Sequence, residues 1–476
     1  MKYKAVIGME VHAELKSERK MFCGCLNNPD EVGVNVNVCP VCLAHPGTLP
    51  VANRKPIESM IKINFALHGR LADKTKFSRK NYFYPDLPKG YQITSQPDPF
   101  IFGGYVEVDE KKIAIDHGHL EEDTGTSIHE GDYTLVNFNR SGVPLMELVT
   151  EPVIESGIEA RRFCEELQLI LRYLGVSDAN MEKGEMRCEV NVSIMPEDFK
   201  EFGTKVEIKN LNSFRAVEKS INYEIERHKA LLEQSEKVIQ ETRGWDEIKN
   251  KTVAQRKKED AHDYRYFPEP DLPEFDLRDF EIERLKNDIP ELPSEKRKRF
   301  IEEYGLSSDQ VEVLVFDRDL ANYFEQTASE LKADFVQASF SSLYNYLVSD
   351  LRGLMKSQNI SFEELKITPE NFVDLILLIE KNVIGSRVAK NVLLRMFKDG
   401  SDPVAIVKEE GLEQVSDEGE LLTIVKKIIS LNNAVVEDYK NGKEKAIKFL
   451  VGQAMKELKG KGDPLKLEEI FKGEIK

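Results

Sequence analysis

One run near the N-terminus restricts the fold of this chain more than any other feature. In the stretch 7–15, apolar residues alternate with Glu10, His12 and Glu14. Successive side chains of a strand point to opposite faces, so the alternation predicts a strand with two carboxylates and an imidazole on one face. Uncompensated carboxylates that face a core are strongly destabilising. The polar face is therefore either solvated or built to hold a cation.

Length and charge narrow the class of protein. A chain of 476 residues exceeds one typical core, so we expect about two to four domains. No apolar run approaches the roughly 18 residues of a membrane-spanning helix, and the N-terminus lacks the apolar segment of a secretory signal. We therefore expect a cytoplasmic protein without membrane segments. A net charge of −17 argues against nonspecific coating of nucleic acid, although it does not exclude a local basic site.

The first 293 residues predict an α+β domain built on a mainly antiparallel sheet. Short β-type runs broken by glycine, proline and asparagine cover 112–115, 135–138, 189–194 and 206–209. Helical periodicity is confined to a few segments, the best of which are 53–67, 157–173 and 214–235. Proline-rich stretches at 268–273 and 289–293 restrict the backbone and mark the end of this domain.

Beyond this domain the pattern is helical almost throughout. Residues 294–400 predict an all-α domain, in which Thr368 is the N-cap of a helix over 371–380. A turn-rich hinge at 398–403 precedes a small helical tail domain, 401–476, with an amphipathic stripe from Ile447 to Leu458. Lysines crowd the tail, which is either a solvated surface or a local basic site. The lysines are Lys440, Lys443, Lys445, Lys448, Lys456, Lys459 and Lys461.

Four of the six cysteines lie in one short loop, 23–42. Cys23 and Cys25 form one pair, and Cys39 and Cys42 form a second pair thirteen residues later. Paired cysteines at this spacing predict a tetrahedral zinc site. Because four protein ligands leave no open position for water, the zinc would brace the loop rather than catalyse. The alternative is a set of unligated buried thiols; the two remaining cysteines, Cys164 and Cys188, fit the core.

Four further segments carry acidic residues within predicted strands, as the first strand does. They are 117–123, 145–151, 187–193 and 205–209. Each alone is typical of a half-exposed strand with a wet face. Together they predict one acid-lined cavity whose oxygen ligands suit Mg²⁺ shared with substrate phosphates. The sequence has no GxxxxGK[ST] loop and no GxGxxG after a strand, so any ATP must bind on another scaffold.

The segment 79–89, RKNYFYPDLPK, combines cations with aromatic residues. Lys80 and Lys89 could hold phosphate while an aromatic ring packs beneath a base. The alternative is an aromatic core segment with solvated lysines.

These motifs together resemble the B subunits of the tRNA-dependent amidotransferases. The likeness rests on long stretches: IGMEVH at 7–12, RKNYFYPDLPKGYQ at 79–92, HLEED at 119–123, 143–152, VEIKNLNSFR at 206–215 and AHDYRYFPEPDLP at 261–273. It implies an N-terminal cradle domain similar to glutamine-synthetase-type catalytic domains, followed by a helical domain and a tail domain. The tail would contact tRNA.

The resemblance also implies the activity and its cofactors. The enzyme would use ATP and Mg²⁺ to phosphorylate the side-chain carboxylate of Glu-tRNA(Gln) or Asp-tRNA(Asn). Ammonia would then displace the phosphate to give Gln-tRNA(Gln) or Asn-tRNA(Asn). The implied partners are a glutaminase A subunit, a C subunit, tRNA and the cognate aminoacyl-tRNA synthetase. Zn²⁺ would be structural, because some family members lack the cysteines.

Site residues follow from the matching motifs. His12, Glu122 and Glu147 would form the Mg²⁺ site with Glu10 beside them, and Glu151, Glu189 and Glu207 would be further acids of the pocket. Phosphate or carboxylate contacts would come from Lys80, Lys89, Arg187 and Lys209. This chain departs from the family pattern at Thr124, Thr126, Glu189 and Val190.

Two other interpretations remain open at this point. One is a non-catalytic, zinc-braced scaffold that binds tRNA, in which the acidic cavity is only a metal-stabilised core. The other is a metal-dependent hydrolase using the face of Glu10 and His12, for which the sequence lacks a nucleophile or a second compact metal motif. No GxSxG or Ser/Lys signature for glutamine hydrolysis is present, so a glutaminase must be a separate chain.

Overall fold

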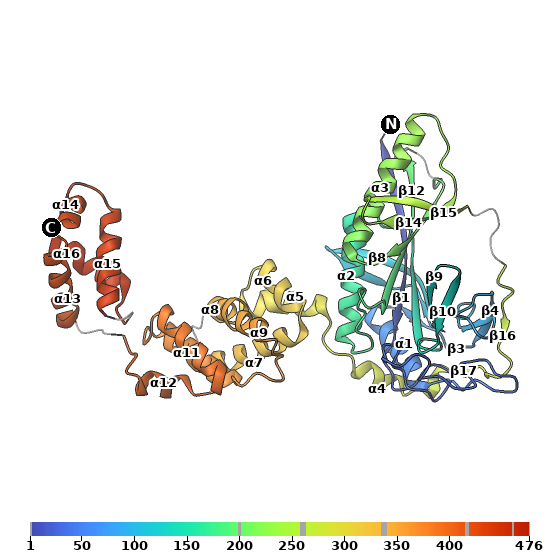
Figure 1. The fold of residues 1–476 in the computed structure, drawn as a ribbon, viewed down its shortest axis with the longest axis horizontal. Coiled ribbons are helices and arrows are strands. Elements are labelled where there is room, and N and C mark those ends of the chain that lie inside the picture. The colour runs from blue at the N-terminus through green and yellow to red at the C-terminus, as the bar shows by residue number, and fades with distance from the viewer. Residues whose placement is uncertain are drawn as a thin grey trace. The chain divides into compact units, whose positions relative to one another are not determined.

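A computed structural model describes residues 2–198, 201–257, 263–334, 340–414, 418–458 and 461–475. Lys459 and the first two residues of the motif at 261–273 lie outside the described residues. The chain divides into two compact units, 1–295 and 296–476, coloured blue to yellow and yellow to red in Figure 1. No helix in the described ranges is long and apolar enough to cross a membrane.

A large mixed sheet dominates the first unit. Its main path follows β15 (Lys251–Lys257), β14 (Glu241–Asp246), β13 (Val206–Leu211), β12 (Met186–Pro196), β1 (Tyr3–Glu14), β11 (Pro144–Thr150), β8 (Lys111–Glu122), β5 (Tyr91–Thr94), β4 (Ser78–Asn81) and β16 (Phe267–Pro268). Beside this path lie β2 (Arg70–Leu71), β6 (Ile101–Phe102) and β7 (Tyr105–Val108). Along the main path only β13 and β14 pair in parallel, so the expected antiparallel character is confirmed.

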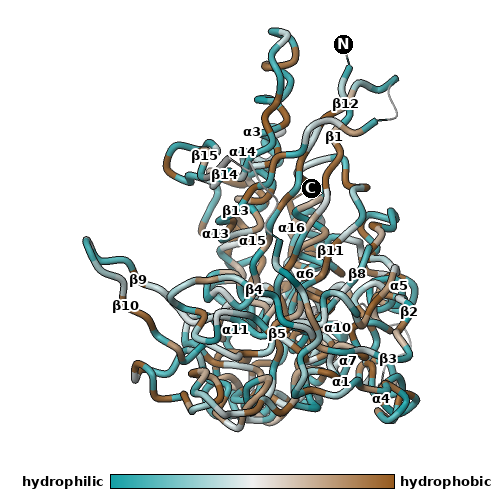
Figure 2. Tube along the Cα trace, turned by 90° about the vertical axis from the view of Figure 1, so that its right-hand side faces the viewer, coloured by the Kyte–Doolittle hydropathy of each residue, from teal (hydrophilic) through white to brown (hydrophobic). Residues whose placement is uncertain are grey.

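The described residues of this unit also form two smaller strand pairs. They are the hairpin of β9 (Thr126–Glu130) with β10 (Tyr133–Asn137), and β3 (Lys74–Thr75) with β17 (Phe275–Asp276). In Figure 2 the hairpin projects away from the sheet. The prediction of strands at 112–115, 135–138, 189–194 and 206–209 is confirmed, apart from the last residue of the second run.

Helices cover one face of this sheet. The described helices of the unit are α1 (Arg54–Ala66), α2 (Gly157–Tyr173), α3 (Phe214–Glu233), a 3₁₀ turn at Leu277–Asp279 and α4 (Ile282–Asn287). The predictions over 53–67, 157–173 and 214–235 are therefore confirmed to within two residues. Asn53, Ser156 and Ser213 cap α1, α2 and α3 with their side chains, as short polar residues commonly do.

The pleat of β1 separates the core from the functional face. Its odd-numbered residues from Ala5 to Ala13 are buried in the core with α2 and α3. Its even-numbered residues from Gly8 to Glu14 remain partly exposed on the other face. Because β12 pairs in register with β1, it carries Arg187 and Glu189 onto the same open face.

The second unit is helical. Its helices are α5 (Pro293–Tyr304), α6 (Ser308–Val315), α7 (Arg318–Asp334), α8 (Phe340–Asn345), a π-helical segment at Tyr346–Leu351, α9 (Arg352–Gln358), α10 (Pro369–Glu380), α11 (Ser386–Asp399), α12 (Pro403–Glu409), α13 (Glu418–Leu431), α14 (Asn433–Lys440), α15 (Lys445–Glu457) and α16 (Pro464–Ile475). Thr368 accepts a hydrogen bond from the Asn371 backbone, so the predicted cap is confirmed. An apolar cluster drawn from 421–475 includes the predicted stripe of α15. The α+β class with following helical segments is confirmed, whereas the boundaries at 293 and 400 stay predictions.

Candidate active site and cysteine cluster

Five side chains from three adjacent strands form an acid cluster on the open face of the sheet. They are Glu10 and His12 on β1, Glu147 on β11, and His119 and Glu121 on β8. Pairing sets His12 opposite Glu147, and Glu147 opposite His119. Nε2 of His12 lies 3.2 Å from Oε2 of Glu147, and Nε2 of His119 lies 3.3 Å from the same oxygen. Glu147 therefore joins two candidate ligand groups, one with β1 and one with β8.

The charges within the acid cluster are strongly coupled. Burial alone would raise the pKa of Glu147, but His119 and His12 hold it well below its usual value. Burial and the neighbouring Glu147 raise the pKa of Glu10 to about 7. Burial opposes protonation of His119, yet Glu147 and Glu121 raise its pKa to about 9. The cluster thus gathers three carboxylates around two imidazoles at a buried position, where a divalent cation would replace the protons that they share.

Unpartnered atoms support the same conclusion. Nδ1 of His119 and Oε2 of Glu121 are buried without a hydrogen-bond partner in the described structure. Buried polar atoms normally have a partner, so these atoms indicate a ligand. Carboxylate oxygens suit Mg²⁺, and imidazole nitrogens suit transition metals. The residues present therefore fit a divalent cation.

Three cationic residues flank the acid cluster. Lys80 on β4 is attracted by Glu121 and Glu147, which raise its pKa although burial opposes this. Nζ of Lys209 lies 2.7 Å from Oε2 of Glu189. Burial would lower the pKa of Lys209, but the attraction of Glu189 raises it. The third cation, Arg187, pairs with Asp123 and belongs to a separate group.

Arg187 belongs to an ion network at the end of β1. Its Nη2 donates to Oδ2 of Asp123 at 2.8 Å, and Nε of Arg140 lies 3.4 Å from the same oxygen. Burial would raise the pKa of Asp123, but the two guanidinium groups lower it. Burial and Asp123 raise the pKa of the nearby Glu14 to about 8. Arg187 is therefore already paired, and any substrate carboxylate must compete with Asp123.

Glu122 does not lie in the acid cluster, contrary to the sequence-based assignment. Its carboxylate accepts a hydrogen bond from Nζ of Lys89 at 2.6 Å and another from the Ile93 backbone at 3.0 Å. The pleat of β8 explains the difference, because consecutive residues point to opposite faces and Glu121 takes the position beside His12. Lys89 consequently lies with Glu122 and not beside Glu147.

Glu151 also lies outside the acid cluster. Two-residue alternation places it on the face of Glu147, but a register shift between Val149 and Thr150 breaks that alternation. The side chain of Glu151 is exposed after the end of β11. Glu189 and Glu207 do share the open face, where Lys209 lies between them.

A cavity of about 280 Å³ adjoins the acid cluster on the same face. From β1 it is lined by Val6, Gly8 and Met9, and Gly8 is two residues before Glu10. Its other lining residues include Asn191 and Ser193 of β12, and Phe202 and Lys205 beyond it. The cavity thus combines apolar walls with polar groups, as small-molecule sites commonly do.

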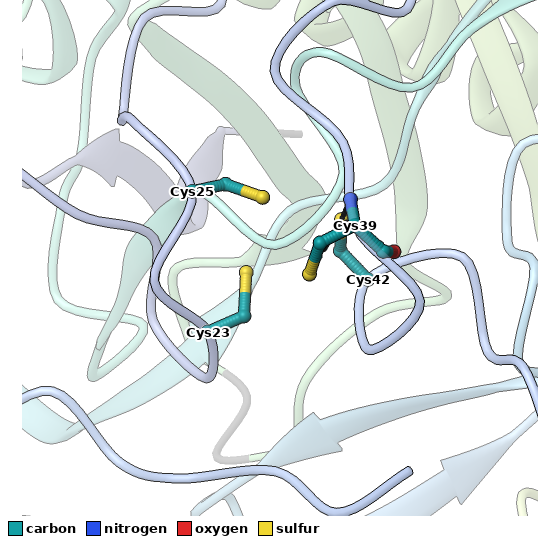
Figure 3. Close-up of side chains that lie close together, drawn as sticks. All are labelled: Cys23, Cys25, Cys39 and Cys42. Atoms are coloured by element: carbon teal, nitrogen blue, oxygen red, sulfur yellow. Dashed lines mark hydrogen bonds between the residues drawn. The ribbon is translucent and has the colours of Figure 1, made fainter.

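The four loop cysteines converge as the spacing predicts. Their sulfur atoms all lie within 4.8 Å of one another, and Figure 3 shows the side chains pointing into a shared space. The Cys39 backbone donates to Sγ of Cys42 at 3.1 Å. Four thiols at this separation fit a tetrahedral ion. Cys164 and Cys188 are buried in the core with their sulfur atoms 3.6 Å apart, which confirms the prediction for that pair.

Comparison with known proteins identifies the family. Residues 5–283 match the model of the GatB/GatE catalytic domain, and residues 322–475 match that of the GatB domain. The chain belongs to the family of amidotransferase B subunits. Curated members named as the B subunit of aspartyl/glutamyl-tRNA(Asn/Gln) amidotransferase include those of Carboxydothermus hydrogenoformans, 45% identical over 99% of both chains, and Persephonella marina, 44% identical over the whole of both. The sequence-based resemblance is confirmed.

Within the fold of this amidotransferase family, sequence reasoning missed His119 and Glu121 as members of the acid cluster. The richness of the segment 117–123 in ionisable groups is plain from the sequence, but the resemblance points to Glu122, whereas the structure places Glu121 beside His12. The available signal is alternation within β8, where Leu120 is buried in the core and therefore puts 119 and 121 on the other face. The alternation covers only a few residues, so the pairing of β8 with β11 is needed to assign the two faces.

Proposed function

We propose that this chain activates the side-chain carboxylate of Glu-tRNA(Gln) or Asp-tRNA(Asn) with ATP for amidation. The carboxylate oxygen attacks the γ-phosphorus, ADP leaves, and the acyl phosphate retains the transferred phosphoryl group. Ammonia then attacks the acyl carbon and phosphate leaves, giving Gln-tRNA(Gln) or Asn-tRNA(Asn). The observation that carries the proposal is the acid cluster with Lys80 beside it.

The residues of the site suit phosphoryl transfer, which mainly requires positioning and charge stabilisation. Mg²⁺, when bound, neutralises charge on the transferring phosphoryl group. Glu10, His12, His119, Glu121 and Glu147 would hold it, with Glu147 common to both ligand groups. Lys80 would attract the incoming phosphates, and Lys209, on the side of Glu10, would do the same. Arg187 would orient the substrate carboxylate only after its ion pair with Asp123 is broken.

The cavity lined by Gly8 would take the nucleoside of ATP. Gly8 and Glu10 are two residues apart on β1, so a triphosphate can run from the cavity along the strand to the acid cluster. Asn191 and Ser193 supply polar groups, while Phe202 supplies an aromatic surface for a base.

Substitution of Gly8 tests the nucleoside assignment. A Cβ at Gly8 would meet only ordinary contacts, 3.8 Å from the Thr150 carbonyl oxygen and 3.9 Å from Pro152, so Gly8→Val fits the strand. Its methyl groups would fill the cavity, and we expect KM for ATP to rise about tenfold. tRNA affinity should stay unchanged. Initial rates at varied ATP measure the effect; an unchanged KM for ATP would place the nucleoside elsewhere.

Trapping of the intermediate tests the proposed reaction. The assembled amidotransferase is incubated with ATP and Glu-tRNA(Gln), without glutamine, in the presence of hydroxylamine, which converts an acyl phosphate to a hydroxamate. We expect ATP-dependent glutamyl hydroxamate on the tRNA and ADP in equal amount. tRNA binding without hydroxamate would support the alternative, a scaffold that holds tRNA while the chemistry takes place in another chain.

We also propose that the cysteine loop binds one structural Zn²⁺ per chain. Cys25→Ser should remove most of the zinc measured by elemental analysis and lower the melting temperature by several degrees, because the ion ties 23–25 to 39–42. Charged-tRNA-dependent ATP turnover should persist below the melting temperature, since the acid cluster shares no ligand with the loop. Cys164→Ser, at a buried thiol outside the loop, is the matched control for zinc content. Full zinc content in the Cys25 variant would contradict the assignment.

The remaining assignments follow from the relatives' names and the chemistry. Ammonia must come from a glutaminase, which we propose is an A subunit assembled with this chain and a C subunit. The tail domain, 401–476, would contact tRNA, with the cognate aminoacyl-tRNA synthetase as a further partner. We also propose a cytoplasmic location, where the substrates of translation are found.

A further inference from the structure

An aromatic wall lies beside the acid cluster and has no part in the chemistry above. It consists of Tyr82 and Tyr84, which follow β4, and Tyr264 and Tyr266, which precede β16. Ring centroids are 6.3 Å apart for Tyr82 and Tyr84, and 6.1 Å apart for Tyr82 and Tyr264. Those of Tyr264 and Tyr266 are 6.0 Å apart. The four rings therefore form a continuous row from two segments about 180 residues apart.

The outer end of the aromatic wall is open to solvent. Tyr84 is 66% exposed, and the neighbouring Phe83 is 88% exposed. The Phe83 ring packs over Gly90, where a Cβ would lie 3.1 Å from it. Two adjacent large rings exposed on a loop are unusual for a folded chain and indicate a binding surface.

Lys80 connects the aromatic wall to the acid cluster. Its Nζ lies 5.2 Å from the ring centroid of Tyr264, within the range of a cation–π contact. The same ammonium is attracted by Glu121 and Glu147. The surface therefore runs without interruption from exposed rings to a cation and then to the carboxylates.

We infer that the aromatic wall, together with the adjacent Phe83, binds the unpaired 3′ end of the substrate tRNA, with its bases stacked on Phe83 and Tyr84. This inference rests on the proposed function. Aromatic rings beside a cation are the usual means of holding single-stranded RNA, since every base has a π face. The amino acid is attached to that 3′ end, so the last nucleotides must lie beside the acid cluster when its carboxylate reacts. The occupant predicted by this continuity is therefore an RNA end.

Binding assays with two forms of tRNA test the inference. The assembled enzyme is titrated with intact tRNA and with the same tRNA lacking its unpaired 3′ nucleotides. In the double variant Phe83→Ala/Tyr84→Ala, Kd for intact tRNA should rise roughly 5- to 30-fold, while Kd for truncated tRNA stays unchanged. The conservative pair Phe83→Tyr/Tyr84→Phe should restore binding. Tyr133→Ala, at a 59% exposed ring on the β9–β10 hairpin, is the matched control and should change neither constant.

Each other outcome overturns the inference. Equal weakening of intact and truncated tRNA would place the contact elsewhere on the RNA, and unchanged binding of both would exclude RNA from the aromatic wall. A rise in KM for ATP with tRNA affinity intact would assign the stacked base to ATP. Failure of the proposed function would appear separately, as absence of hydroxamate in the wild-type enzyme.

Discussion

Glu147→Gln should lower charged-tRNA-dependent ATP turnover by about 1,000-fold, equivalent to ~4 kcal/mol of transition-state stabilisation. Glutamine keeps the shape of the side chain but removes the charge that His12 and His119 share. It also replaces the charged ligand common to both candidate metal groups with a neutral amide. No other single substitution among the five residues of the acid cluster has that double effect.

The experiment measures ADP release by the assembled enzyme with and without Glu-tRNA(Gln). Glu151→Gln is the matched control, because Glu151 is the next acid along the chain but is exposed outside the acid cluster. We expect it to retain wild-type turnover. The Glu147 variant should still bind tRNA with wild-type affinity. Turnover within a factor of about three of wild type would move the phosphoryl transfer away from the acid cluster and leave the chain as a tRNA scaffold.

Glu224→Gln should lower the free energy of unfolding by about 3–5 kcal/mol, the usual effect of removing one partner from a buried ion group. Glu224 on α3 is fully buried. Its oxygens lie 2.7 Å from Nη2 of Arg227, 3.1 Å from Nε2 of His228 and 3.2 Å from Nε of Arg243, and Thr252 donates to it. Loss of the charge leaves the guanidinium groups of Arg227 and Arg243 beside the β14–β15 hairpin without the carboxylate that they share.

Thermal or urea unfolding of the wild type and the variant measures this effect. Glu226→Gln is the matched control on the same helix, because Glu226 is 72% exposed and pairs only with Lys229 at the surface. Its effect should stay below about 1 kcal/mol. Equal stability of the two variants would show that the buried group contributes no more than a surface pair.

The stabilisation by Glu224 should also depend on pH. Burial would raise its pKa, but His228, Arg227 and Thr252 lower it from 4.5 to about 2. Because the folded-state pKa is depressed, the contribution is fully present above the unfolded value and is lost as pH falls from about 4.5 toward about 2. The stability difference between wild type and Glu224→Gln should therefore narrow over that interval. A constant difference would show that packing, and not charge, accounts for the effect.

Periodicity and spacing in the sequence are sufficient to predict a feature that lies within a single helix, strand or loop. The helix at 157–173 is predicted to the residue, because its apolar spacing and its Ser156 cap are both local. The cysteine loop is predicted for the same reason, since spacing alone restricts how four thiols can meet. The polar face of β1 is also evident, because strict alternation continues through most of the strand.

Features that depend on pairing between strands are beyond sequence reasoning. The choice between Glu121 and Glu122 requires the register of β8 against β11. The position of Glu151 depends on a shift between Val149 and Thr150, which no composition pattern marks. The contact of Tyr82 with Tyr264 joins segments that only the fold brings together.

The two faces of β1 impose different constraints on inheritance. Replacement of an odd-numbered residue would affect whether the protein folds. Replacement of an even-numbered residue would affect whether the reaction proceeds. The odd-numbered and even-numbered positions can vary independently, provided that the number of residues between them does not change. Deletion of a single residue within the strand would exchange the two sets, turning carboxylates inward and aliphatic groups outward. Strand length is therefore a stricter inherited requirement here than the identity of most of its side chains.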